Sequence, residues 1–172
     1  CDIMVQDGIT PFIWSGTYAH GYTELLLNAL LADYSGKDEM TVNYTMDGTI
    51  SIINSINNGN PITEIVQITE ANGYKIFSQE GRYYALKFLE EILSNSSYCS
   101  PSCFNSTVSH IDAQEIFLYS RFNQSKPIAM LIDGSWWQNE ADYIFNEMEG
   151  IYGESASKES RRFGFMPMPA AT

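Results

Sequence analysis

Aromatic and hydrogen-bonding side chains are concentrated in two short segments, each of which follows an apolar run. Residues 14–22 contain rings and hydroxyls that can both stack on a ligand and form hydrogen bonds. Residues 133–137 contain a carboxylate followed by two adjacent indoles. Such groups suit a neutral polar ligand such as a sugar, because flat faces pack on C–H groups while oxygens bind hydroxyls. The candidate ligand-binding residues are Trp14, Tyr18, His20, Tyr22, Asp133 and Trp136.

Each candidate also has a structural explanation. Trp136 and Trp137 can both be buried side chains. The alternative for His20 is a solvent-exposed or structurally paired imidazole, and an Asp-Gly pair such as Asp133-Gly134 is first of all a turn signal. His110 stands at a helix start, where a structural role is expected.

Catalytic signatures do not emerge from the sequence. A glycoside hydrolase needs two carboxylates that flank the scissile bond, and the 21 acidic residues offer too many candidates to single out a pair. The sequence contains no Ser/His/Asp elbow, HExxH, GxxxxGK or Rossmann glycine pattern. We therefore assign no catalytic residue and expect a binding protein that is not an enzyme. The alternatives are a surface module that contacts a partner protein and, less favoured, a glycoside hydrolase domain.

The composition restricts the partners. A formal net charge of -12 repels phosphate backbones and anionic lipids, and basic residues cluster only at Arg161-Arg162. We therefore expect no nucleic-acid partner. No apolar run approaches the roughly 20 residues of a membrane span, and no signal-peptide pattern begins the chain, so we expect no direct membrane insertion. A chain of 172 residues that is 44% hydrophobic suffices for one core, which predicts a single domain, 1–172.

Three cysteines leave at least one thiol unpaired within the chain, and we expect this to be Cys1. Cys99 and Cys103 flank Ser100-Pro101-Ser102, where a turn can bring the sulfurs within bonding reach, so both a disulfide and a reduced pair remain open. A CxxxC without another cysteine or a nearby histidine is a poor zinc site. We expect no metal and no cofactor.

The first half of the chain predicts a strand and a helix around the first segment. Residues 1–8 are typical of a helix end closed by Gly8, residues 10–14 of a buried strand, and residues 18–34 of a nearly fully buried helix. A hairpin is predicted from residues 40–45 and 49–53 around Met46-Asp47-Gly48. Residues 57–61 are predicted as a loop, and residues 62–72 suit either helix or strand.

The second half predicts helices on either side of an apolar strand. An amphipathic stripe indicates a helix over 81–95, followed by a loop over 95–107. A capping box of Ser109 and Asp112 starts a helix to about Arg121, and residues 128–132 form the best central strand. A second capping box, Ser135 and Gln138, starts a helix with Trp137, Ala141, Ile144, Phe145 and Met148 on its inner face. A loop is predicted over 149–161, and residues 163–169 are predicted to form a strand that runs into an extended segment.

Three segments in register resemble one known family. Residues 126–137 (KPIAMLIDGSWW), residues 162–169 (RFGFMPMP) and residues 7–12 (DGITPF) follow the order and spacing of the second lobe of extracellular solute-binding proteins. These proteins serve ABC importers of the maltose and multiple-sugar type. The resemblance covers nearly the whole chain, and it is the combination of segments that is specific.

The resemblance implies a fold, a ligand and partners. The fold is an α/β, helix-rich lobe of the type II periplasmic-binding-protein-like class, with a small mixed sheet flanked by helices. A sugar lies between this lobe and a missing second lobe, and Trp136 is its stacking platform, with Trp137 turned about 100° into the core. The importer's membrane subunits are the protein partners. The chain is expected to be a fragment of a longer extracellular or periplasmic protein, lipid-anchored through a segment outside it.

Overall fold

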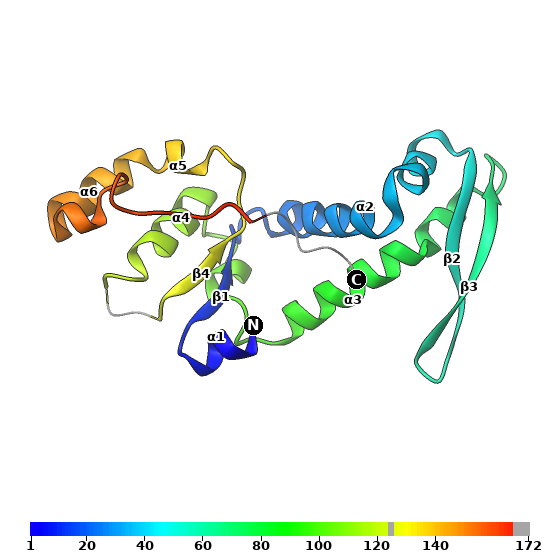
Figure 1. The fold of residues 1–172 in the computed structure, drawn as a ribbon, viewed down its shortest axis with the longest axis horizontal. Coiled ribbons are helices and arrows are strands. Elements are labelled where there is room, and N and C mark those ends of the chain that lie inside the picture. Colours follow the sequence, from blue (N-terminus) through cyan, green and yellow to red (C-terminus); the bar gives the residue numbers. More distant parts are fainter. Residues whose placement is uncertain (124–125, 167–172) are drawn as a thin grey trace. The chain divides into compact units, whose positions relative to one another are not determined.

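The computed structural model describes residues 1–123 and 126–166, and their contacts divide the chain into two compact units (Figure 1). Unit 1 consists of Cys1–Tyr22 and Ile92–Met166, and the described part of unit 2 is Thr23–Glu91. Small two-stranded sheets flanked by helices confirm the predicted α/β class. The assignment of residues 1–172 to one lobe of a two-lobed protein stays a prediction.

Unit 1 is built on a parallel pair of strands, β1 (Thr10–Ile13) and β4 (Ile128–Leu131). Phe12 of β1 is opposite Met130 of β4 and also forms a bridge to Cys99 on its other side. Both predicted strands are confirmed. However, β1 and not β4 has partners on both sides among the described residues, so the prediction of β4 as the central strand is wrong.

The helix that precedes β1 ends as its sequence predicts. Helix α1 (Asp2–Gln6) is followed by Gly8 at a φ of 75°, a conformation that costs glycine little because it has no Cβ. The amide of Gly8 donates to the carbonyl of Val5 at 3.1 Å and that of Ile9 to Met4 at 2.8 Å. These two bonds are the Schellman pattern, which satisfies carbonyls at a helix end.

The two predicted capping boxes have different outcomes. Helix α4 (His110–Tyr119) starts with the reciprocal bonds of Ser109 and Asp112, so the first box is confirmed. The second is wrong, because the N-cap residue of α5 (Trp137–Glu140) is Trp136, and no side chain caps this helix. A separate helix, α6 (Asp142–Tyr152), follows it, and the predicted inner-face residues Ala141, Ile144, Phe145 and Met148 are buried.

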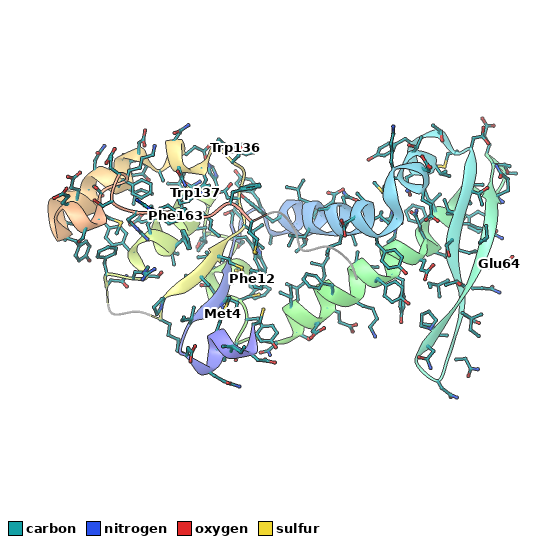
Figure 2. The ribbon with its side chains drawn as sticks, viewed as in Figure 1. Met4, Phe12, Glu64, Trp136, Trp137 and Phe163 are labelled. Atoms are coloured by element: carbon teal, nitrogen blue, oxygen red, sulfur yellow. The ribbon has the colours of Figure 1, made fainter. Side chains whose placement is uncertain are left out.

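A strand was predicted over 163–169, but the described part of this segment contacts the helices of unit 1 through the aromatic ring of Phe163. Figure 2 shows Phe163 close to Trp137. The ring centroid of Phe163 lies 5.0 Å from that of Trp137 and 5.8 Å from that of Phe117. The guanidinium carbon of Arg161 lies 4.9 Å from the centroid of the Phe163 ring. Burial lowers the pKa of Arg161 to about 10. Residues 163–166 form no strand. Phe163 packs on the helices, whereas Phe165 and Met166 are exposed. Residues 167–169 lie outside the described residues.

In unit 2 the predicted hairpin is displaced along the chain. Helix α2 (Ala19–Thr45) kinks at Gly36 and continues through residues 40–45, which were predicted as a strand. The hairpin consists of β2 (Gly48–Asn57) and β3 (Asn60–Ile68), paired antiparallel around Asn58-Gly59. Both turn residues have positive φ, 49° and 81°, which an Asn-Gly pair tolerates well. The segment 62–72, open between helix and strand, is thus mostly strand.

Helix burial is lower than predicted for α2 and as predicted for α3 (Glu80–Ser94). Within residues 18–34 only Leu26, Leu30 and Leu31 are buried, and Leu25 is 67% exposed. One stripe of α2 is buried, Leu27 and Ala29 are half-buried, and Leu25 faces outward. Of the stripe predicted for α3, which consists of Ala85, Phe88, Leu89 and Ile92, Phe88 is half-buried and the other three residues are buried. The hairpin core of unit 2 contains Val42, Ile50, Ile52, Val66, Ile68 and Ile76.

The loops contain short helical turns. Gly73–Ser78 forms the 3-10 helix η1, Pro101–Phe104 forms η2 in the predicted loop 95–107, and Glu154–Ala156 forms η3. The predicted loop 149–161 is wrong at its start, since α6 continues to Tyr152. Within residues 1–123 and 126–166, no helix combines the length and the apolar character that crossing a membrane requires.

Candidate functional site

The candidate residues follow the carboxyl ends of β1 and β4. Because the two strands are parallel, the loops that leave them emerge at the same edge of the sheet. One loop leads from β1 into α2 and carries Tyr18, and the first turn of α2 carries His20 and Tyr22. The other leads from β4 into α5 and carries Asp133 and Trp136. We call this edge of unit 1 the strand-end site.

Tyr22 and Asp133 meet at the centre of the strand-end site. The Tyr22 hydroxyl donates to Oδ1 of Asp133 at 3.3 Å. Burial, followed by the nearby charge of Asp133, raises the pKa of Tyr22 to about 12. At neutral pH the phenol is therefore protonated, so it remains a hydrogen-bond donor and keeps the Asp133 carboxylate in place.

Gln114, which sequence reasoning missed, joins a second carboxylate to this pair. Its side chain is fully buried, and its Nε2 donates to Oδ2 of Asp133 at 2.9 Å and to Oε2 of Glu140 at 3.0 Å. One amide thus holds two carboxylates that would otherwise repel each other. Its Oε1 is buried without a hydrogen-bond partner among the described residues. The available signal was a polar residue beside the buried stripe Ala113 and Phe117 of α4.

Trp136 presents its indole at the surface of the site. The side chain is 59% exposed, and Figure 2 shows it at the start of α5. A Cβ at Gly134 would lie 2.2 Å from the Trp136 ring, so the indole rests directly on this glycine. Trp137, one position later, packs among Phe117, Phe145 and Phe163. The adjacent indoles therefore have separate environments: Trp136 is exposed, and Trp137 is half-buried among aromatic rings.

The β1 loop places its candidates at different depths. Tyr18 is 54% exposed, with its ring centroid 6.0 Å from that of His110. His20 is exposed at the start of α2. Trp14 is only 1% exposed and packs edge-on against Phe104 at 6.0 Å. Trp14 is therefore a core residue below the strand-end site, where its ring has no surface to offer a ligand.

The chemistry of the site is that of acceptors beside exposed rings. Asp133 and Glu140 supply carboxylate oxygens, Tyr22 a hydroxyl, and Tyr18 and Trp136 the exposed aromatic faces. In the part of the chain that the structure describes, no three His, Cys, Asp or Glu side chains lie close enough together to hold a metal ion. A shallow, open depression on α3, lined by Tyr83, Leu86, Lys87 and Glu90, contains none of the predicted residues.

Comparison with known proteins found no matching family model, no similar curated protein and no similar solved structure.

Proposed function

We propose that this chain is the carbohydrate-binding lobe of an extracellular solute-binding protein that delivers a sugar to an ABC importer. The observation that carries the proposal is the meeting of Tyr22 and Asp133 at the ends of two parallel strands, beside the exposed Trp136. Ligands of α/β proteins commonly bind at the carboxyl ends of parallel strands, where loop side chains converge.

The chemistry of the strand-end site suits a neutral polyol. Sugar hydroxyls would donate to the Asp133 and Glu140 carboxylates, while the C–H faces of the sugar ring would pack on Trp136 and Tyr18. A net charge of -12 disfavours an anionic ligand. A sugar carries no charge and meets no such barrier.

The wider assignment rests on the resemblance of residues 7–12, 126–137 and 162–169. It implies a periplasmic-binding-protein-like lobe, with a second lobe outside this chain that closes over the sugar. The importer's membrane subunits would recognise the closed form. The protein would act outside the cytoplasmic membrane or in the periplasm, anchored by lipid, and would not alter its ligand chemically.

The proposal is tested by sugar titration of the full-length protein that contains this chain, monitored by calorimetry and tryptophan fluorescence. We expect micromolar affinity for the full-length protein and millimolar affinity for residues 1–172 alone, because half of the contacts and the exclusion of water are missing. Trp136→Ala should weaken binding by about 1–3 kcal/mol, or roughly 5- to 150-fold.

Tyr44→Ala is the matched control, since Tyr44 is 82% exposed and belongs to unit 2. Its affinity should equal that of the parent. Failure of the full-length protein to bind any sugar in a panel of mono- and oligosaccharides would contradict the proposal. So would unchanged affinity in Trp136→Ala.

A glycoside hydrolase is the second candidate, because Gln114 holds the Asp133 and Glu140 carboxylates within reach of the same nitrogen. Paired carboxylates are the catalytic groups of most such enzymes. Assaying the titration mixtures for released reducing sugar separates the two functions. Release that disappears in both Asp133→Asn and Glu140→Gln would establish hydrolysis. Capture of the importer's membrane subunits by the full-length protein, dependent on sugar, would support transport and distinguish it from a general interaction module.

A further inference from the structure

A loop that contains two cysteines lies beside β1, on the side opposite β4. The amide of Phe12 donates to the carbonyl of Tyr98 at 2.9 Å, and the amide of Ser100 donates back to the carbonyl of Phe12 at 2.9 Å. These bonds place Cys99 beside the strand, as a parallel bridge to Phe12. Cys103 lies one turn later, in η2. The loop therefore brings two thiols, four positions apart, against the same strand.

The two sulfurs are buried together. Cys99 is 3% exposed and Cys103 is fully buried. Cys99 Sγ lies 3.8 Å from the carbonyl oxygen of Ile92, and Cys103 Sγ lies 3.9 Å from that of Phe12. The neighbouring Cys103 thiol, followed by burial, raises the pKa of Cys99. Both thiols are free in the structure, so the pair is in its reduced form.

A helix cap and close backbone packing hold the loop that carries Cys99 and Cys103. Ser100 Oγ caps η2 by accepting from the amide of Ser102 at 3.3 Å. A Cβ at Gly16 would lie 2.6 Å from the carbonyl oxygen of Ser102 and 2.0 Å from that of Asn105, so the loop packs directly on the backbone that leads to Tyr18. The loop that carries both thiols is therefore packed against β1 and against the backbone that follows it.

We infer that Cys99 and Cys103 form an intramolecular disulfide when the chain folds in the presence of glutathione disulfide. One cysteine thiolate attacks glutathione disulfide, forming a mixed disulfide and releasing one glutathione thiolate. The other cysteine thiolate attacks the protein sulfur of that mixed disulfide and releases the second glutathione. The protein pair loses two electrons and two protons, and glutathione disulfide is reduced to two glutathione molecules.

Burial determines when this exchange occurs and how the product behaves. The folded thiols are shielded from a reagent as large as glutathione, so the exchange takes place before the loop packs on β1. Once packed, the disulfide is shielded from reductants in the same way. Cys1 is exposed, whereas the other two cysteines are buried, so Cys1 is the thiol that we expect to stay unpaired. The inference does not depend on the proposed function.

The experiment uses Cys1→Ser as the parent, so that only the pair is counted. The protein is refolded in a mixture of reduced and oxidised glutathione, then denatured and alkylated with N-ethylmaleimide for mass spectrometry. We expect no alkylated thiol and a mass about 2 Da below that of the reduced protein, as two-electron oxidation requires. Two alkylated thiols, or a protein that carries glutathione instead, would overturn the inference.

A thermal measurement provides a second test. The melting temperature of the oxidised parent should exceed that of the reduced parent by roughly 4–8 °C, the effect of closing a short loop in a chain of this size. The matched control carries Cys99→Ala and Cys103→Ala, and its melting temperature should not respond to reductant during refolding. A parent that likewise shows no response would contradict the inference.

Discussion

Gln114 shows how one buried side chain organises the strand-end site. It lies on α4, next to the buried Ala113, and it donates to the carboxylates of Asp133 and Glu140. Tyr22 supplies a second side-chain bond to the same Asp133, across 111 sequence positions. The position of Asp133 is therefore fixed by donors on two sides.

Replacing Gln114 tests this organisation. Gln114→Met keeps the side-chain volume but removes both donors, so Asp133 and Glu140 lose their shared partner. We expect a loss of about 1–3 kcal/mol in the free energy of unfolding, as for buried polar groups left without a partner. Urea denaturation followed by circular dichroism measures it.

Gln6→Met is the matched control, because Gln6 is exposed in α1. Its stability should stay within about 0.5 kcal/mol of the parent, as for other surface substitutions. Equal stability of Gln114→Met and Gln6→Met would mean that the amide does not support the two carboxylates.

At the scale of elements, glycines have opposite roles in two places. Gly59 forms the β2–β3 turn at a φ of 81°, a conformation that an L-residue adopts only under strain. Gly150 lies inside α6, where an added Cβ would meet nothing within 4 Å. The same substitution should therefore change stability in opposite directions at these two positions.

Gly59→Ala should destabilise the protein by about 1–2 kcal/mol, because alanine pays the left-handed penalty. Gly150→Ala should stabilise it by roughly 0.5–1 kcal/mol, since alanine loses less backbone entropy in a helix than glycine does. Thermal and urea unfolding of both variants beside the parent provide the measurement. A neutral or stabilising Gly59→Ala would exclude the strained turn.

At the scale of the whole molecule, acidic residues outnumber basic ones 21 to 9. Lys158 pairs with Asp142, whereas Arg161 stacks on two phenylalanine rings and donates to a backbone carbonyl. Much of the negative charge is therefore not neutralised by basic residues, and the acidic side chains repel one another. Screening by salt should relieve this repulsion.

We expect the melting temperature to rise by on the order of 2–4 °C between low salt and physiological salt, the equivalent of about 1 kcal/mol. Sugar affinity should change less than twofold over the same range, because the proposed ligand is neutral. Differential scanning fluorimetry and calorimetry at matched pH follow the two quantities. A melting temperature that falls with salt would indicate that attractive ion pairs dominate.

Local chemistry determined the elements that depend only on neighbouring residues. Gly8 closes α1, Ser109 and Asp112 start α4, and the apolar runs become β1 and β4, because each signal acts within a few positions. The hairpin prediction was wrong for a related reason. The Asn58-Gly59 turn signal was interpreted as a loop, and the β-prone residues 40–45 belong to α2. Periodicity alone does not separate such short runs.

Tertiary structure decided which side chains meet. The sequence by itself placed Tyr18, Tyr22, Asp133 and Trp136 at strand ends, but only the parallel pairing of β1 with β4 brings Tyr22 to Asp133. Tertiary packing also buries Trp14 in the core. It adds Gln114 and Glu140 to the strand-end site, although no local sequence pattern singles them out. Contacts between residues far apart in the chain depend on how whole elements pack, and this information is spread over the sequence and absent from any one segment.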